Sequence, residues 1–135
     1  MITKKVHLTR FSCSVNCFGM FRTIKAFTPI LRQQASSGFQ GTRIMNLTSM
    51  AGLAHPFPGT NPYMASKHAA NILSQGVRLE LAPFGIQVCS VNPSFHETPL
   101  VAGMSDQINK QFQSLPEEIK KVYGEGTFIT MQHSF

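Results

Sequence analysis

The chain has 135 residues, of which 42% are hydrophobic and 13% are charged, and its formal net charge is +6. This composition supports a hydrophobic core and argues against a disordered chain, at a length close to one ordinary domain. The three cysteines cannot all form disulfides with one another, because their number is odd. They are also not accompanied by the second group of ligands that a zinc site needs. Reduced thiols in a reducing compartment are therefore favoured, and no metal site is predicted.

The basic residues are distributed unevenly. Nine of the twelve lie at or before Arg78, while the first acidic residue is Glu80. A positive chain can bind nucleic acid or an anionic membrane surface. These residues are scattered, however, and form no basic cluster interleaved with aromatic residues, so no nucleic-acid partner is predicted. No stretch approaches the ~20 apolar residues of a membrane span.

The chain begins with a basic segment and continues into an amphipathic pattern. Residues 1–14 are basic and free of acid, which is compatible with a mitochondrial presequence, although a short disordered leader is the favoured alternative. Over residues 14–33 apolar side chains recur at helical spacing and predict a long helix. These side chains, expected in a core or an interface, are Phe18, Phe21, Ile24 and Phe27.

The middle of the chain predicts a strand, a helix and a second strand. Residues 42–52 are typical of a strand that ends in hydroxyl side chains and a turn. A helix over residues 61–81 should end at Pro83 and Gly85, and residues 85–93 should form a second, buried strand. This order predicts a right-handed crossover unit of a parallel α/β sheet, with both polar strand ends at the edge where such sheets bind ligands.

Two residues of the predicted helix suggest acid/base chemistry. Tyr63 and Lys67 are four residues apart and therefore share one helix face. A fixed ammonium favours the phenolate form of a neighbouring tyrosine and makes it a usable acid/base near neutral pH. The spacing also recurs by chance, and the alternative is an exposed face on which the lysine runs along a half-buried tyrosine. The flanking strands favour the acid/base interpretation. Cys89, within the second strand, is expected to be a small core residue.

Together these segments resemble the short-chain dehydrogenase/reductase family, and more narrowly its retinol, hydroxysteroid and D-beta-hydroxybutyrate dehydrogenases. The resemblance runs from about residue 15 to residue 128, and residues 115–125 favour the narrower branch. Its motifs are residues 15–20, residues 46–52, the Tyr-x-x-x-Lys of Tyr63 and Lys67, and residues 92–98. It implies a partial doubly wound parallel sheet, similar to a Rossmann fold.

The resemblance also implies a mechanism. Tyr63 would exchange a proton with the substrate oxygen while a hydride moves between the substrate carbon and a nicotinamide. Ser49 would hydrogen-bond the same oxygen. Lys67 would bind the nicotinamide ribose, and Asn16 would hold a water that links Lys67 to solvent. The implied substrate is an apolar alcohol or ketone of the retinoid, steroid or hydroxy-acid class.

The implied cofactor is NAD or NADP. Besides Tyr63 and Lys67, the resemblance places Pro93 and Thr98 in the loop that binds the nicotinamide. Ser94 stands where the family has glycine, which would strain the loop if that position required a positive φ. An apolar lid, which in relatives covers the substrate, is expected from Leu100, Val101, Met104, Ile108 and Phe112.

The sequence lacks the family's glycine-rich turn for the pyrophosphate. The chain is therefore expected to be a piece of a dehydrogenase without the N-terminal cofactor-binding half, divided into a leader at 1–14, a partial domain at 15–128 and a tail at 129–135. The alternative function is a noncatalytic fragment that associates with a full-length partner. Homo-oligomers or aggregates are expected through the helices at 14–33 and 61–81. The resemblance also suggests that the chain associates with mitochondria or with the endoplasmic reticulum.

Overall fold

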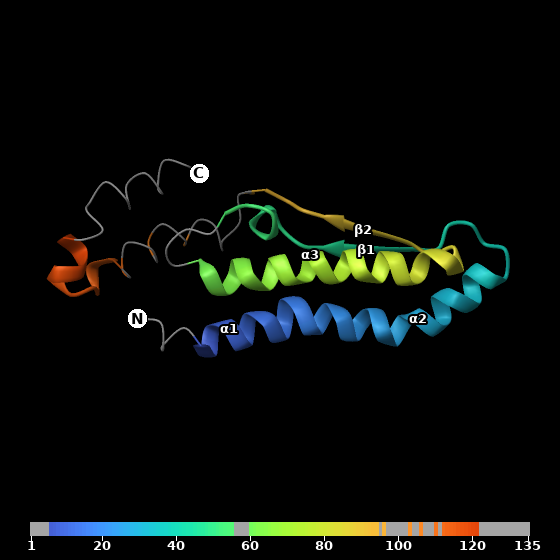
Figure 1. Ribbon diagram of the computed structural model, residues 1–135, viewed down its shortest axis with the longest axis horizontal. Coiled ribbons are helices and arrows are strands. Elements are labelled where there is room, and N and C mark those ends of the chain that lie inside the picture. The colour runs from blue at the N-terminus through green and yellow to red at the C-terminus, as the bar shows by residue number, and fades with distance from the viewer. Residues whose placement is uncertain are drawn as a thin grey trace. The chain divides into compact units, whose positions relative to one another are not determined.

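The computed structural model describes residues 6–55, 60–94, 96, 103, 106, 110 and 112–121. They belong to two units, Met1–Ser94 and Phe95–Phe135. The elements of the first unit are, in chain order, α1 (Val6–Cys13), a π-helical segment η2 (Ser14–Gly19), α2 (Met20–Ser36), β1 (Arg43–Leu47), a 3-10 turn η3 (Met50–Gly52), α3 (Asn61–Leu81), a second 3-10 turn η4 (Ala82–Phe84) and β2 (Gln87–Val91) (Figure 1).

The first helical segment is longer than the sequence predicts. The apolar repeat predicts a helix over residues 14–33, whereas helix begins at Val6 and continues, through the π-helical segment, to Ser36. Residues 6–13 contain no glycine or proline that would interrupt a helix, and α1 packs along α3. The expectation of a disordered leader is therefore wrong for Val6–Cys13.

The predicted strand, helix and second strand are confirmed. β1 and β2 pair in parallel, in a register that runs from Arg43 opposite Gln87 to Leu47 opposite Val91. α3 connects them and has the bounds that the sequence predicts. Its end is followed by η4 and by Gly85, which has a φ of 73° in the left-handed region that glycine adopts without strain.

The core lies between the helices and one face of the sheet. α2 and α3 lie on the same side of β1 and β2 (Figure 1). The side chains that meet there are Ile24, Val77, Leu81, Ile86 and Val88, with Met20, Leu31, Ala35 and Ile44 packed against them. Arg32 also stacks on Phe84, with its guanidinium carbon 3.8 Å from the ring centroid, and so joins the end of α2 to η4.

The other face of the sheet is exposed within the described part of the chain. Residues along β2 alternate, so that Val88 is 4% exposed whereas Cys89 on the opposite face is exposed. The expectation that Cys89 is a core residue is wrong, because the described helices cover only one face. Met45 and Leu47 of β1 share the open face and are 64% and 71% exposed.

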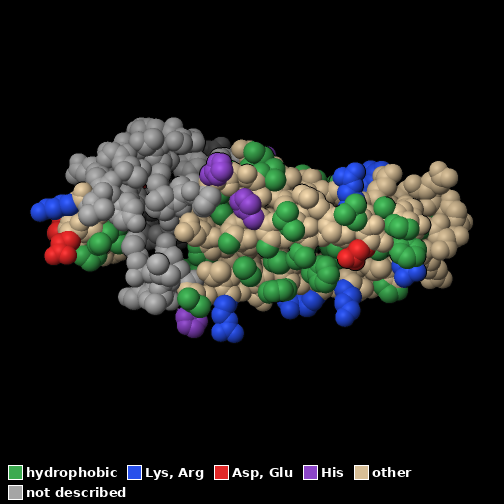
Figure 2. Space-filling view, viewed as in Figure 1, with side chains coloured by type: hydrophobic (Ala, Val, Ile, Leu, Met, Phe, Trp, Pro, Cys, Tyr) green, Lys and Arg blue, Asp and Glu red, His purple; other side chains and the backbone are tan. Residues whose placement is uncertain are grey.

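Large apolar side chains are also exposed on the helices. Figure 2 shows hydrophobic side chains spread over the helical side of the first unit. Phe11 of α1, Phe27 of α2 and Leu79 of α3 all belong to this exposed set. Surfaces of this composition are typical of regions that contact another protein.

The described residues of the second unit include a short helical turn at 117–121. The side chains of Lys120 and Glu117 form an ion pair there at 2.7 Å. Of the expected lid residues, Phe112 is described, whereas Leu100, Val101, Met104 and Ile108 lie outside the described residues. Among the helices that the structure describes, none has the length and apolar character needed to cross a membrane.

Candidate active site

Lys67 brings the end of β1 and the first turns of α3 together. Its Nζ donates a hydrogen bond of 3.1 Å to the backbone carbonyl oxygen of Thr48 and lies 5.7 Å from the centroid of the Tyr63 ring. No ion pair among the described residues involves Lys67. Its positive charge is thus held next to the phenol and to the peptide that leads into Ser49, and no carboxylate of a described residue pairs with it.

The Tyr63 side chain is partly exposed. It is 41% exposed, and its hydroxyl has no hydrogen-bond partner within the described residues. Tyr63 lies in the first turn of α3, which begins after Thr60 and has Pro62 at one of its first positions, where proline favours helix initiation. The phenol is therefore free to exchange a proton with a ligand while its backbone is fixed by the helix.

Ser49 has an extended backbone and precedes the turn η3. Its Oγ accepts a hydrogen bond of 3.1 Å from the backbone N–H of Ala51. This bond uses an acceptor site of the hydroxyl and leaves its proton without an acceptor in the described structure. Ser49 can therefore donate a hydrogen bond to a substrate oxygen.

The two strand ends are connected beyond the sheet. The Thr48 hydroxyl lies 3.1 Å from the backbone oxygen of Val91 and 2.5 Å from Oδ1 of Asn92, two acceptors that share its single proton. The backbone N–H of Met50 donates to the carbonyl oxygen of Pro93 at 3.0 Å. The turn that carries the Ser49 side chain and the start of the predicted nicotinamide loop are therefore fixed against each other.

Close packing positions the same turn against α3. A Cβ atom added to Gly52 would lie 2.7 Å from the backbone oxygen of Lys67 and would also collide with Nδ2 of Asn71. That Nδ2 donates to the Gly52 carbonyl oxygen at 3.2 Å. Glycine is therefore required where the Ser49 turn approaches the helix.

Asn16 reaches the site from the π-helical segment. Its Nδ2 donates to Oγ of Ser66 at 3.1 Å, and that hydroxyl donates to the backbone oxygen of Tyr63 at 2.6 Å. Single π-helical turns occur often at functional sites. The neighbouring Cys17 is buried, and desolvation together with the nearby Cys13 raises the pKa of its thiol.

The structure thus brings Asn16, Ser49, Tyr63 and Lys67 around the first two turns of α3, and their catalytic roles stay predictions. Pro93 lies beside the Ser49 turn through its bond to Met50, whereas Thr98 lies outside the described residues. No described residue other than glycine has a positive φ, so serine at position 94 adopts its backbone conformation without the strain considered above.

Sequence reasoning missed two parts of the site. The Thr48 carbonyl oxygen binds Lys67, but a backbone acceptor leaves no signal in a sequence. Ser66 connects Asn16 to Tyr63, and its only signal is a hydroxyl three residues after the tyrosine.

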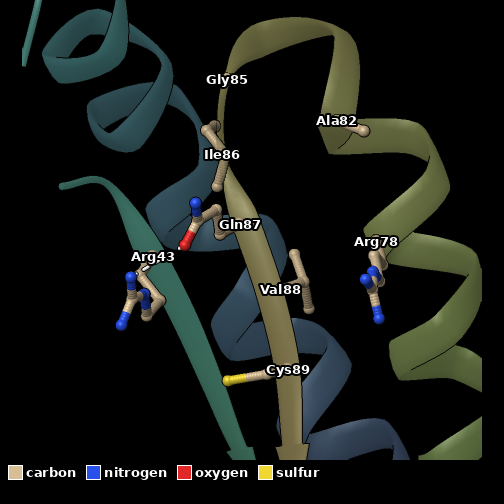
Figure 3. A pocket seen from close by; sticks show the side chains of 8 residues that line it. All are labelled: Arg43, Arg78, Ala82, Gly85, Ile86, Gln87, Val88 and Cys89. Carbon is tan, nitrogen blue, oxygen red and sulfur yellow. Dashed lines mark hydrogen bonds between the residues drawn. The ribbon is translucent and has the colours of Figure 1, made fainter. Parts of the chain in front are cut away.

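A hollow among the described residues lies away from this site. It has a volume of about 610 Å³ and lies along the other end of β2, between Arg43, Arg78 and Cys89 (Figure 3). The two guanidinium groups lie on opposite sides of β2, and Arg43 donates to Gln87 at 2.8 Å. None of the predicted site residues lines this hollow.

Comparison with known proteins identifies relatives of the chain. A family model described as short chain dehydrogenase matches residues 4–109. Human 17-beta-hydroxysteroid dehydrogenase type 2 is 36% identical over 126 residues, which cover 90% of this chain and 30% of that protein. Retinol dehydrogenase 5 of Mus musculus is 31% identical over 124 residues, which cover 88% of this chain and 36% of that protein.

A solved structure agrees with these relatives. The short chain dehydrogenase from Burkholderia cenocepacia J2315, in complex with NADP, superposes with a TM-score of 0.64 at 30% identity, over 75% of this chain and 39% of that chain. The chain spans about a third of the length of the relatives it matches. Because the family model covers most of this chain and the fold agrees with a solved member, the chain belongs to the short-chain dehydrogenase family.

Proposed function

We propose that the chain is an oxidoreductase that takes part in hydride transfer between NAD or NADP and an apolar alcohol or ketone. The observation that carries this proposal is the position of Lys67. Its ammonium is held by the Thr48 carbonyl oxygen at 3.1 Å and lies 5.7 Å from the Tyr63 ring, at the carboxyl end of β1. Parallel α/β sheets bind ligands at this edge.

Three side chains would act on the substrate oxygen. In the direction of ketone reduction, Tyr63 would donate its proton to the oxygen, and in alcohol oxidation it would accept that proton. Ser49 would donate a hydrogen bond to the same oxygen as negative charge develops on it. Lys67 would stabilise the phenolate form of Tyr63, because its charge is not neutralised by any described carboxylate.

The residues present fit the nicotinamide end of a dinucleotide. An ammonium group has three donors, and Lys67 uses one of them for the Thr48 carbonyl oxygen, so two remain for ribose hydroxyls. Pro93 is fixed beside the Ser49 turn, where the nicotinamide would bind, and Thr98 is proposed to bind its carboxamide. When bound, the nicotinamide supplies or accepts the hydride. The NADP in the Burkholderia structure supports this cofactor class.

The proposed substrate class is a retinoid, a steroid or a hydroxy acid. The names of the human hydroxysteroid dehydrogenase and the mouse retinol dehydrogenase support an apolar secondary or primary alcohol.

Binding and turnover test the proposal in two steps. The purified chain is titrated with NADH and with NADPH while nicotinamide fluorescence is followed, first for the wild type and then for Lys67→Met. Lys25→Met, at an exposed position of α2, is the matched control. Because the sequence lacks the glycine-rich turn for the pyrophosphate, we expect the wild type to bind weakly, Lys67→Met to bind more weakly still, and Lys25→Met to bind as the wild type does. Absence of binding for both cofactors, or equal binding by all three proteins, would contradict the proposal.

A second candidate function is association without catalysis, either with a second copy or with a full-length partner. It is favoured by the open face of the sheet, where Met45 and Leu47 are more than half exposed. The double variant Met45→Lys and Leu47→Lys should reduce the mass measured by light scattering after size exclusion if this face mediates association. A wild-type chain that remains a monomer at all concentrations would exclude association with a second copy.

A further inference from the structure

Two of the three cysteines lie one helical turn apart. Cys13 is the last residue of α1, and Cys17 lies in the π-helical segment that follows it. Residues four apart share one face of a helix, and their Cβ atoms lie about 5–6 Å apart. Cys17 is 5% exposed, whereas Cys13 is partly exposed. The pair therefore has one thiol that solvent reaches and one that the fold encloses.

The two thiols are close enough to influence each other. Burial raises the pKa of the Cys17 thiol, and the neighbouring Cys13 raises that pKa as well. The state in which both thiols are ionised is therefore disfavoured, because two negative charges would lie side by side. Neither sulfur takes part in a hydrogen bond within the described residues. Both thiols are thus available to a ligand that forms bonds to sulfur.

The spacing of the pair selects a ligand that bridges two sulfurs. A disulfide needs Cβ atoms about 3.5–4.5 Å apart, so a direct bond would have to draw the helical turn together. A single atom bonded to both sulfurs spans the longer gap. Zinc takes four ligands in structural sites, and among the described residues no group of three or more His, Cys, Asp or Glu side chains could hold a metal ion. Thiol ligands select soft centres, and a trivalent arsenic that carries one organic group needs only two thiols.

We propose that Cys13 and Cys17 form a dithiol site that binds a trivalent arsenical. When an arsenoxide, R–As=O, binds, each sulfur forms one bond to arsenic and the bond between arsenic and oxygen breaks. The two thiol protons leave with that oxygen as water. Arsenic stays trivalent, so the step needs neither an oxidant nor a reductant.

The exposure of the two thiols determines the order of the steps. The partly exposed Cys13 reacts first, and the second bond then forms within the chain when local opening of the π-helical segment uncovers Cys17. The second step is intramolecular, so the pair should hold the arsenical about 10²–10⁴-fold more tightly than either thiol alone.

Intact-mass spectrometry of the native chain tests the site with phenylarsine oxide as the probe. One equivalent should add the mass of the reagent less one water to the wild type, and excess glutathione, a monothiol, should not remove the adduct. In Cys13→Ser and in Cys17→Ala the probe concentration needed for the adduct should rise by about 10²–10⁴-fold. Cys89→Ser is the matched control and should behave as the wild type does, because the exposed Cys89 lies on the face of the sheet opposite the helices.

The variants also separate loss of the site from loss of the fold. Cys13→Ser changes a partly exposed position and should leave the circular dichroism spectrum unchanged, so it carries the test even if Cys17→Ala does not fold. An adduct that Cys13→Ser retains as well as the wild type does, or that Cys89→Ser loses, would overturn the proposal.

Alkylation of the wild type locates the bound arsenic independently. With phenylarsine oxide bound, iodoacetamide should no longer label Cys13, whereas Cys89 should be labelled as fast as without the probe. Peptide mass spectrometry distinguishes the two positions. Unchanged labelling of Cys13, or protection of Cys89, would show that this pair does not hold the arsenic. Neither measurement needs a cofactor or turnover, so the result does not depend on the proposed function.

Discussion

Gly52 offers a sharp test of the packing that places Ser49 beside α3. In Gly52→Ala the new Cβ would lie 2.7 Å from the Lys67 backbone oxygen, a distance at which the turn or the helix must move. Overpacking of this kind costs about 1–3 kcal/mol. Movement would also break the bond from Asn71 to the Gly52 oxygen, and a buried amide left without a partner costs about 1–3 kcal/mol more. We expect the free energy of unfolding to fall by about 2–6 kcal/mol, the sum of these terms.

Urea unfolding followed by circular dichroism measures this change. Gly76→Ala is the control, because Gly76 lies within α3 and an added Cβ there meets no atom within 4 Å. Replacing a helical glycine by alanine should raise the free energy of unfolding by about 0.5–1 kcal/mol. The two substitutions add the same methyl group and should act in opposite directions. If Gly52→Ala were as stable as the wild type, the close approach between the turn and α3 would be refuted.

Three further outcomes are expected. Tyr63→Phe keeps the ring and removes the proton donor, so any turnover should fall by ~10²–10⁴-fold without a change in circular dichroism, and an unchanged rate would mean that another group is the acid. Iodoacetamide at neutral pH should label Cys89 before Cys17, because burial and the nearby Cys13 raise the pKa of the Cys17 thiol and thereby reduce its thiolate fraction. Peptide mass spectrometry checks this order, and equal labelling would contradict it. Thr48→Val removes the hydroxyl that donates to the acceptors at the end of β2, so the free energy of unfolding should fall by about 1–2 kcal/mol in urea, and no loss would mean that this hydroxyl does not stabilise the strand ends.

The sequence predicts the central part of the fold because local signals agree there. Proline at the start of α3, and Pro83 and Gly85 after it, define that helix, and the apolar runs on both sides predict the parallel strands. It does not predict the π-helical segment, because a single shifted turn leaves the apolar repeat nearly unchanged. The exposure of Cys89 was also missed, since burial of a sheet face depends on which elements cover it.

Within the site, side-chain spacing predicts Tyr63 and Lys67, and the motif context predicts Ser49. The contacts that hold them in place were missed for a physical reason. Lys67 binds a backbone carbonyl oxygen, and the residue that supplies it could be of any type. The approach of Gly52 to α3 is likewise a property of the folded chain, because the turn and the helix meet only in three dimensions.

The π-helical segment makes the position of Asn16 depend on residue count. Hydrogen bonds there span five residues, so Ser14–Gly19 accommodates more residues per turn than the flanking α-helices. Deleting one residue between Cys13 and Met20 would allow a continuous α-helix, because the π-helical segment takes up about one residue more than an α-helix that turns through the same angle. α1 and α2 would then keep nearly the same faces towards α3, whereas the residues of the segment itself, Asn16 among them, would shift relative to Ser66. The effect of such a deletion is therefore expected at the site and not in the packing of the flanking helices.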